Sequence, residues 1–407
     1  MRVLQINQTD TSGGAALAGY RLHQGLLEQE IDSRLLVQVA KINSDRIAVI
    51  PRTKLAIENQ IYRISWKLGH NYIHLVSSFD IPQHKFYREA DILNFHNLHG
   101  NYFNYLAIPS LTSEKPAVFT LHDMWSFTGH CAYSYDCDRW KTGCGKCPYL
   151  AIYPEINIDS TLVEWKLKNW VYSRSNLTIV TPSSWLTEQV KQSILNRFPI
   201  HHIPYGIDME AYQPLDKKQC KYVLGIPESK KVLMFGSVSV KDARKGGDLL
   251  LQALQKLPAS LKAETVLLTM GNDSEGMAAT VGIQCLNLGY ITSDRLKSVA
   301  YSAADLFIFP TRADNLPLVL QESMACGTPM VSFKIGGVPD LVRHGITGYL
   351  AESENIQDFS QGIIELLADG EMRDRMSQQC RAIALKEYSV SLQAKRYIEL
   401  YRQLLDN

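Results

Sequence analysis

The sequence lacks any long apolar run. No stretch of its 407 residues approaches the roughly 18 apolar residues that a membrane-spanning helix needs. The first residues, MRVLQINQTDTSGG, also lack the basic lead and the apolar run of a signal peptide, and they fit a strand followed by a turn. We therefore expect a cytoplasmic protein, in which disulfides are not expected.

The sequence also lacks an excess of either charge. Its 42 Lys and Arg residues balance 41 Asp and Glu residues, which leaves a formal net charge of +1. Because there is neither a net attraction nor a basic stripe, nucleic acid is not expected as a partner. No internal repeat or low-complexity tract is present. The hydrophobic content of 45% and the length predict two or three globular domains.

What the sequence does have is a regular alternation of short apolar runs with amphipathic helical stretches. This alternation predicts an α/β fold with parallel sheets covered by helices. Pro and Gly interrupt the pattern near HIPYGIDMEAYQP, residues 202–214, and separate two series of strands. The first series is predicted at 3–6, 34–39, 92–95, 117–121 and 177–181, and the second at 232–236, 266–270, 284–288, 306–310, 330–333 and 348–350. Two such series predict two doubly wound, Rossmann-like domains, with a ligand between them at the carboxyl ends of the strands.

The segment FPTRADNLPLVLQESMACGTPMVSFKIGG, residues 309–337, predicts a phosphate site at the start of a helix. An apolar strand ends in a polar loop, Asn315 is suited to cap the helix that follows, and Pro317 suits its first turn. The backbone N–H groups of Leu316 and Leu318 would then be free to bind a phosphate group.

Two carboxylates flank this helix start. Glu322 lies roughly 8–11 Å along the predicted helix, a distance that suits the ribose hydroxyls of a nucleotide whose diphosphate sits at the helix start. Asp314 would lie beyond the diphosphate, near a donor sugar. The alternative is an ordinary capped surface helix on which Glu322 is a solvated charge.

Two further loops follow predicted strands. Arg244 and Lys245 lie in a basic loop that opens a helix near Gly247, where they could neutralise a diphosphate; the alternative is a solvated basic loop. Gly13 and Gly14 follow the first strand and allow close approach of the backbone to a ligand, although they do not form a GxGxxG fingerprint. A tight turn without any ligand is the alternative there.

Three histidines also follow predicted strands. His122, at the end of the strand 117–121, could donate to a sugar hydroxyl or to a developing charge, and its alternative is a structural role. His96 and His99 are more simply explained as shaping the acceptor side or the fold.

Four cysteines lie close together within HCAYSYDCDRWKTGCGKCP. Their density favours a closed structural zinc site with Cys131, Cys137, Cys144 and Cys147 as ligands. Redox-active or free thiols are the alternatives. A catalytic zinc is disfavoured because four protein ligands leave no open position.

Residues 57–76 form an apolar, aromatic and basic stretch with Arg63, Trp66, Lys67 and Tyr72. Such a helix could rest on a membrane interface. Packing of this helix on its own domain is the alternative, and the sequence favours it.

Taken together, these motifs resemble those of the retaining glycosyltransferases of family 4, which have the GT-B fold. The resemblance rests on two acidic residues separated by seven (Asp314 and Glu322), on Lys245-Gly246, on Gly13-Gly14 and on PYGID. The block HDMWSFTGHCAY…CDRWKTGCGKCP looks like a subgroup from bacterial exopolysaccharide assembly, colanic-acid-type enzymes among them. Two positions depart from the family pattern: Asp314 stands where Glu is usual, and Ser237 stands where a basic residue is common.

The resemblance implies retaining transfer of a sugar from a nucleotide diphosphate sugar to a hydroxyl of a glycan or lipid-linked acceptor, with no catalytic metal. Lys245, Arg244 and the helix amides would stabilise the leaving diphosphate, Asp314 and His122 would position the donor sugar, and Glu322 would hold the ribose. The resemblance also implies an acceptor domain at 1–205, a donor domain at 206–387, a last helix at 388–407 that crosses back, and peripheral contact with the inner membrane face. Two rival functions are a nucleotide-sugar epimerase of the same fold and a zinc-bearing binding protein without catalysis.

Overall fold

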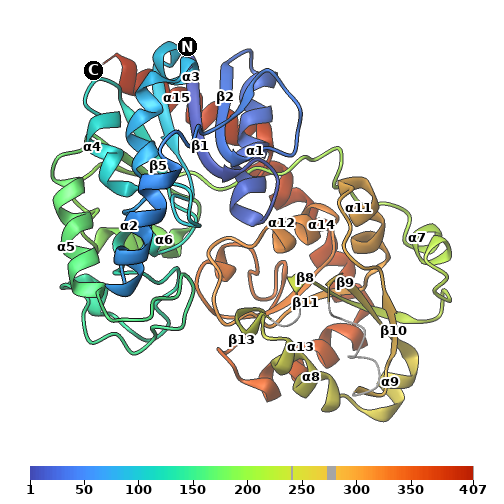
Figure 1. The fold of residues 1–407 in the computed structure, drawn as a ribbon. Helices are drawn as coiled ribbons and strands as arrows, with labels where there is room; N and C mark the ends of the chain where they lie inside the picture. Colours follow the sequence, from blue (N-terminus) through green and yellow to red (C-terminus); the bar gives the residue numbers. More distant parts are fainter. Residues whose placement is uncertain (240–241, 273–280, 407) are drawn as a thin grey trace. The chain divides into compact units, whose positions relative to one another are not determined.

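The computed structural model describes residues 1–239, 242–272 and 281–406. The chain forms two compact units (Figure 1). The first unit comprises Met1–Gly206 and Ser391–Asn407, and the second unit comprises Ile207–Val390. In the described part of the chain, no helix is long and apolar enough to cross a membrane.

The first unit contains a seven-stranded sheet in which all neighbouring strands are parallel, in the order β3-β2-β1-β4-β5-β6-β7. Its strands are β1 (Arg2–Thr9), β2 (Asp32–Val39), β3 (Ile47–Val49), β4 (Ile92–Phe95), β5 (Ala117–Thr120), β6 (Thr178–Thr181) and β7 (Ile200–His202). The strand order reverses between β1 and β4. Ligands of doubly wound sheets bind at the carboxyl ends of the strands beside such a reversal.

Helices cover both faces of this sheet. One face packs against α1 (Gly14–Glu28) and the last helix, α15 (Val390–Leu405), whose Tyr397 and Tyr401 are fully buried. Their hydroxyls bond to Thr120 and Asn94 on the sheet, each at 2.9 Å. The other face supports an aromatic core around Trp125. The remaining helical segments are α2 (Leu55–Lys67), η1 (Val76–Gln83), α3 (Lys85–Glu89), η2 (Tyr105–Ala107), α4 (Ile108–Leu111), η3 (Trp125–Phe127), η4 (Arg139–Lys141), α5 (Thr161–Tyr172) and α6 (Ser184–Lys191).

The second unit contains a six-stranded sheet, again parallel between all neighbours, in the order β10-β9-β8-β11-β12-β13. The strands are β8 (Lys231–Ser239), β9 (Thr265–Asn272), β10 (Gln284–Asn287), β11 (Leu306–Phe309), β12 (Met330–Phe333) and β13 (Gly348–Ala351). Its helical segments are α7 (Lys217–Val223), η5 (Ala243–Lys245), α8 (Gly247–Gln255), α9 (Ala259–Glu264), α11 (Asp294–Ala303), α12 (Leu318–Ala325), η6 (Val338–Asp340), α13 (Ile356–Ala368) and α14 (Gly370–Glu387). Here the strand order reverses between β8 and β11, so the loops after these two strands share one edge of the sheet.

The predicted α/β fold with two doubly wound parallel sheets is confirmed. Every strand predicted from an apolar run is present, within a few residues of its expected bounds. Within the described residues, the strands that the sequence missed are the short edge strands β3 and β7, which have three residues each and are half-buried. A strand of this length carries too few residues to show either alternation or a buried run.

Candidate functional site

The loops after β8 and β11 are fastened together at the strand reversal of the second unit. The backbone carbonyl of Arg244 accepts hydrogen bonds from the N–H of Arg312 (2.8 Å) and from the hydroxyl of Thr311 (3.0 Å). Gly246 has a φ of +69°, and a Cβ there would lie 1.9 Å from the carbonyl oxygen of Pro310. The close approach of the two loops therefore requires glycine at this position.

Arg244 and Lys245 converge on the carboxylate of Asp314. The Nζ of Lys245 lies 2.5 Å and the Nη1 of Arg244 lies 3.1 Å from Asp314 Oδ2. Burial opposes ionisation of Asp314, but the charges of Lys245 and Arg244 hold the pKa of this carboxyl below its ordinary value. Burial also lowers the pKa of Lys245, and the charge of Asp314 opposes this effect. The three predicted residues therefore form one partly buried cluster, and Asp242 adds a second carboxylate, 3.3 Å from Nη2 of Arg244.

The start of α12 differs from the prediction. Asn315 was expected to be the N-cap residue, but that position is taken by Pro317, whose side chain makes no cap hydrogen bond. The N–H of Asn315 donates to Asp314 Oδ1 at 3.0 Å. Leu316 lies before the helix, and Leu318 is its first residue. Pro317 takes the extended backbone conformation that precedes a helix, so the helix starts two residues later than predicted.

Glu322 is buried within α12. It is 3% exposed, and its Oε2 accepts a hydrogen bond of 3.0 Å from the hydroxyl of Tyr301. The alternative of a solvated surface charge is therefore wrong. Because α12 begins at Leu318, Glu322 lies about 6 Å along the helix axis from its first residue, a shorter distance than predicted.

In the first unit, the turn after β1 contains both predicted glycines. Gly13 has a φ of +87° and is the N-cap of α1, without a side-chain hydrogen bond to the helix end. A Cβ at Gly13 or Gly14 would meet no heavy atom within 4 Å, so the backbone is accessible there. The positive φ explains the glycine at position 13 as a turn, and the binding of a ligand by either glycine stays a prediction.

His122 belongs to a buried chain of hydrogen bonds that runs from Tyr205 to His23. The links are Tyr205 Oη to His122 Nδ1 (2.7 Å), His122 Nε2 to His96 Nδ1 (3.1 Å), His96 Nε2 to Gln5 Oε1 (2.8 Å), Gln5 Nε2 to Ser33 Oγ (2.9 Å) and Ser33 Oγ to His23 Nδ1 (2.8 Å). For neutral rings, the amide of Gln5 sets the proton positions of His96 and His122. Its oxygen accepts from His96, so His96 Nδ1 accepts from His122, and His122 Nδ1 accepts from Tyr205.

Burial favours the neutral form of the three histidines. It lowers the pKa of His122 to about 4 and that of His23 to about 4, and it lowers the pKa of His96 well below its ordinary value. Both ring nitrogens of His122 are already bonded within the protein, so donation to a sugar would require one of these bonds to open. A direct catalytic role of His122 stays a prediction.

Sequence analysis did not find the partners of the histidines. Gln5 and Tyr205 lie far from His122 in the sequence, and no local pattern marks them. The same holds for a second pairing at this edge, in which His99 Nε2 lies 2.7 Å from Asp123 Oδ2 and His99 Nδ1 lies 3.2 Å from the hydroxyl of Tyr153. These contacts could have been expected from the fold, because β4 and β5 are neighbouring parallel strands and the residues that follow them lie at the same edge of the sheet.

The four clustered cysteines line a single cavity of about 20 Å³ together with His130. All four are free thiols. Burial raises the pKa of Cys131 to about 12 and that of Cys144 to about 11, so both are protonated at neutral pH. Two sulfurs accept backbone hydrogen bonds: Cys144 from the N–H of Gly129 (3.2 Å), and Cys147 from that of Tyr149 (3.4 Å).

These thiols are not arranged as a metal site. Among the described residues, no group of three or more His, Cys, Asp or Glu side chains is placed to hold a metal ion. A histidine also contacts the cluster: His130 Nε2 lies 3.4 Å from Cys147 Sγ. Cys131, Cys137, Cys144 and Cys147 therefore share one cavity, as four ligands of one ion would, but zinc binding stays a prediction.

The helix predicted in residues 57–76 is α2, which ends at Lys67. The sequence favoured packing of its apolar residues on its own domain, and this expectation is wrong for most of them. The helix buries Glu58 and Ser65 and exposes Ile57, Ile64 and Trp66. Tyr72, which follows the helix, is buried against Trp125.

Two family models match this chain, and they meet close to the boundary between the two compact units. A family model described as "Glycosyltransferase Family 4" matches residues 12–211, and one described as "Glycosyl transferases group 1" matches residues 216–382. The chain is 27% identical to the putative colanic acid biosynthesis glycosyl transferase WcaC of Escherichia coli (strain K12), over 99% of this chain and 100% of that protein.

Solved structures share the fold at low sequence identity. Sucrose-phosphate synthase from Thermosynechococcus elongatus has a TM-score of 0.74 and 16% identity, and the match covers 100% of this chain and 99% of that one. Anabaena Alr3699/HepE in complex with UDP-glucose has a TM-score of 0.69 and 16% identity, covering 99% of this chain and 100% of that one. With two doubly wound units and both family models matched in succession, the chain belongs to the family 4 glycosyltransferases of the GT-B fold.

Proposed function

We propose that the protein transfers a sugar, with retention at the anomeric carbon, from a nucleotide diphosphate sugar to a hydroxyl of a glycan or lipid-linked glycan. The pathway we propose is assembly of an exopolysaccharide or cell-surface polysaccharide, because the full-length relative is named for colanic acid biosynthesis. The observation that carries the proposal is the convergence of Lys245 and Arg244 on Asp314 at the strand reversal of the second unit.

The charges of this cluster suit a diphosphate. Lys245 and Arg244 face Asp314 in a partly buried site just before α12 in the chain, and Asp242 pairs with Arg244 from a more exposed position. A helix N-terminus carries a partial positive charge and donates N–H groups to anions. A diphosphate placed there would meet the two cations and the N–H groups of Leu318 and Val319 together.

The reaction that we propose exchanges one bond at the anomeric carbon. The bond from this carbon to the diphosphate oxygen breaks and the electron pair leaves with the diphosphate, while the acceptor oxygen bonds to the carbon from the same face. The acceptor proton passes to the departing phosphate oxygen, so atoms and charge balance. Lys245 and Arg244 would stabilise the charge that develops on the diphosphate, the kind of preorganised interaction that lowers a barrier by several kcal/mol.

The two carboxylates would hold the other parts of the donor. When the diphosphate replaces Asp314 as the partner of Lys245 and Arg244, the carboxylate of Asp314 can accept a hydrogen bond from a hydroxyl of the donor sugar. Glu322, buried and held by Tyr301, would accept the ribose hydroxyls. A neighbour of the same fold was solved with UDP-glucose, which supports a nucleotide sugar as donor here. We propose no catalytic metal, since the two cations and the helix N-terminus supply the positive charge.

A donor and acceptor panel tests the proposal. We expect transfer that depends on the acceptor, with the product retaining the donor's anomeric configuration. Lys245→Ala should lower kcat/KM by about 10²–10³-fold, and Lys256→Ala, an exposed lysine at the end of α8, should leave it unchanged. Epimerised sugar without acceptor transfer would favour the epimerase, and nucleotide binding without turnover would favour a binding protein.

We also propose that the four clustered cysteines bind a structural zinc ion. They line one cavity and two of their sulfurs accept backbone N–H groups, an arrangement that orients and stabilises thiolates. Because the described thiols are not placed as a metal site, binding would require the side chains to turn into the cavity and release their protons.

A further inference from the structure

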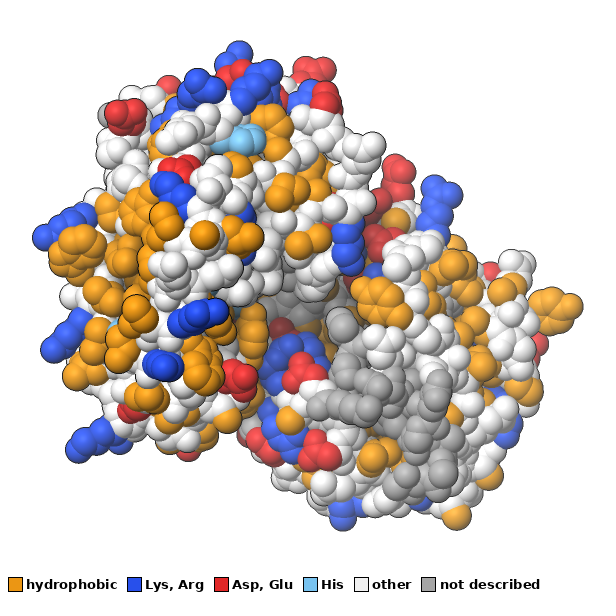
Figure 2. All heavy atoms as spheres, in the orientation of Figure 1, with side chains coloured by type: hydrophobic (Ala, Val, Ile, Leu, Met, Phe, Trp, Pro, Cys, Tyr) orange, Lys and Arg blue, Asp and Glu red, His pale blue; other side chains and the backbone are white. Residues whose placement is uncertain are grey.

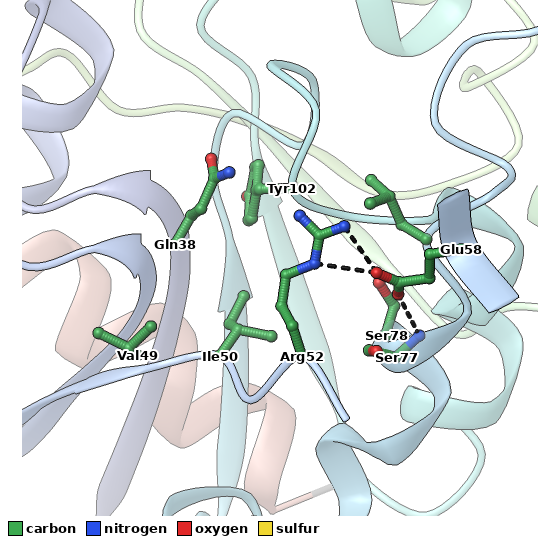
Figure 3. Close-up of a pocket in the computed structure, with 9 residues that line it drawn as sticks. Gln38, Val49, Ile50, Arg52, Glu58, Ser77, Ser78 and Tyr102 are labelled. Carbon is green, nitrogen blue, oxygen red and sulfur yellow. Dashed lines mark hydrogen bonds and ion pairs between the residues drawn. The ribbon is translucent and has the colours of Figure 1, made fainter. Parts of the chain in front are cut away.

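A pocket of about 60 Å³ lies in the first unit, where β2 and β3 end. We call it the Tyr102 pocket (Figure 3), and the residues that matter here are Gln38, Val49, Ile50, Arg52, Leu75 and Tyr102. Ligands of doubly wound sheets bind at the carboxyl ends of the strands. One water needs about 10–15 Å³ of such a volume, so the pocket admits a group of about four to six heavy atoms.

The two opposite charges at the pocket are paired with each other. Figure 3 shows Arg52 beside Glu58, whose Oε2 accepts hydrogen bonds from Nε and Nη2 of Arg52 at 2.9 Å and 2.6 Å. Its Oε1 accepts the N–H of Ser77 at 2.8 Å. Burial raises the pKa of Glu58, but these bonds and the charge of Arg52 outweigh it and keep the carboxylate ionised. An anionic ligand would have to displace Glu58, so the pocket suits a neutral group.

Helix α2 turns its polar side toward the pocket. Its Glu58 lines the pocket, whereas Ile57 and Ile64 are more than half exposed. Figure 2 shows hydrophobic side chains on the outer surface of this part of the first unit. The ion pair with Glu58 therefore fixes the guanidinium of Arg52 at the pocket, and the exposed apolar residues of the helix lie outside it.

Three polar side chains of the pocket have hydrogen-bonding groups that the protein does not use. The hydroxyl of Tyr102 is buried and has no hydrogen-bond partner among the described residues, which is unfavourable for a buried polar group. Nη1 of Arg52 takes no part in the hydrogen bonds with Glu58. Nε2 of Gln38 donates to the carbonyl of Asn101 at 3.3 Å, which leaves the amide oxygen as an acceptor. The pocket thus offers two donors and one acceptor.

The rest of the pocket is apolar. Ile50 and Leu75 are buried, and Val49, the last residue of β3, is half exposed. A ligand group that fits must therefore be neutral and small, with a methyl-sized apolar part, one hydrogen-bond acceptor and one donor.

We propose that the Tyr102 pocket holds the acetamido group of an N-acetylated sugar in the acceptor. The carbonyl oxygen of this group would accept from Tyr102 and Arg52, its N–H would donate to Gln38, and its methyl would lie against the apolar side chains. An O-acetyl ester lacks the N–H, and a sugar hydroxyl is too small to fill the pocket. This inference rests on the proposed function, because it names the class of the acceptor.

Titration of the full-length protein by saturation-transfer NMR, without donor, tests the inference. The probes are the methyl glycosides of N-acetylglucosamine and N-acetylgalactosamine, of glucose and galactose, and of glucuronic acid. We expect an N-acetylated glycoside to bind at least about tenfold more tightly than its parent sugar, with the strongest saturation on the acetyl methyl protons. Equal affinity for N-acetylated and parent glycosides, or tighter binding of the glucuronide, would overturn the proposal.

Two variants test the pocket itself. Tyr102→Phe should weaken binding of the N-acetylated glycoside by about tenfold without lowering the thermal unfolding midpoint, because no described residue bonds to this hydroxyl. Its matched control is Tyr87→Phe, which removes a hydroxyl that donates to the carbonyl of Leu111 at 2.9 Å. The control should lower the midpoint and leave binding unchanged. A lower midpoint in Tyr102→Phe with unchanged binding would overturn the proposal.

The second variant is Val49→Phe, which should obstruct the pocket and abolish binding of the N-acetylated glycoside. Val39→Phe enlarges a side chain of similar exposure at the end of β2 and should bind as the wild type does. Equal binding by both variants would overturn the proposal.

A transfer assay separates this inference from the proposed function. Binding of the N-acetylated glycoside without transfer to any acceptor would support the pocket and contradict the proposed function. Transfer to glucose or galactose acceptors as fast as to N-acetylated ones would contradict the inference and leave the proposed function in place.

Discussion

The Nζ of Lys245 lies 2.5 Å from Oδ2 of Asp314, although the two residues are 69 positions apart in the sequence. The parallel sheet brings them together, because β8 and β11 are neighbours at the reversal of strand order. The pair holds the loop after β8 against the loop after β11. It also leaves Arg244 as a second cation beside the same carboxylate.

Replacing Asp314 by Asn tests whether an anion is required at this point. The change leaves the largely buried Lys245 without its ionic partner, whereas Arg244 keeps its pair with Asp242, so we expect the free energy of unfolding to fall by about 3 kcal/mol. A nucleoside diphosphate should restore part of this loss by supplying the missing negative charge. Thermal unfolding with and without the nucleotide measures both effects.

The control for this experiment is Asp248→Asn, which breaks the more exposed pair of Asp248 with Arg312. We expect it to cost less than about 1 kcal/mol and to leave the nucleotide-induced shift unchanged. If Asp314→Asn and Asp248→Asn gave the same nucleotide-induced shift as the wild type, the diphosphate would not share the cations of Asp314.

The chain of neutral histidines predicts a loss of stability in mild acid. Burial, with a smaller contribution from the charge of Arg46, lowers the pKa of His23 to about 4, against 6.5 for an ordinary histidine. Between these values the unfolded state takes up a proton that the folded state does not bind, so the free energy of unfolding falls as the pH falls. For His23 alone the loss between pH 7 and pH 4 is about 3 kcal/mol.

Denaturant unfolding at several pH values measures this loss. His23→Asn keeps an acceptor for the hydroxyl of Ser33 but cannot be protonated, so the slope of stability against pH should decrease by about one proton. His202→Asn, at an exposed position on β7, should leave the slope unchanged. An unaltered slope in His23→Asn would show that His23 is not buried in its neutral form.

The sequence predicted the residues of the candidate site better than their contacts. Arg244, Lys245 and Asp314 could be found because each follows an apolar run, and the ends of parallel strands share one edge of the sheet. Their mutual pairing could not be found, because it depends on the position of β11 beside β8 rather than on local spacing. The N-cap of α12 was predicted at Asn315 because asparagine is often found at such positions. The start of the helix is instead set by the extended backbone of Pro317.

The orientation of α2 could not be predicted from its periodicity. Periodicity shows that a helix has two unlike sides, but not which side faces the protein. Here Arg52, which lies outside the helix, neutralises Glu58 and makes a polar side suitable for burial. The edge strands β3 and β7 escaped prediction because three residues are too few to show a period.

The cysteine cavity predicts zinc in the purified protein. We expect about one zinc ion per chain by elemental analysis, lost in Cys144→Ser/Cys147→Ser and kept in Cys285→Ser, whose thiol lies in the second unit. Removal of the metal should lower the thermal unfolding midpoint, because the ion would fix a loop with little regular structure. A metal-free wild type whose four thiols are labelled as readily as that of Cys285 would contradict zinc binding.

The burial of Glu322 predicts discrimination between ribose and deoxyribose. A carboxylate that accepts a ribose hydroxyl makes a charge-assisted hydrogen bond, whose loss costs about 1.5–3 kcal/mol, or about 10–100-fold in Kd. The wild type should therefore bind the 2′-deoxy form of its preferred nucleoside diphosphate more weakly by this factor. Glu322→Gln should bind both forms with nearly equal, lower affinity, while Glu264→Gln, at an exposed position, should discriminate as the wild type does.

Calorimetric titration of the two nucleotides gives the ratio of their Kd values directly. A wild type that binds both forms equally would place the ribose away from Glu322.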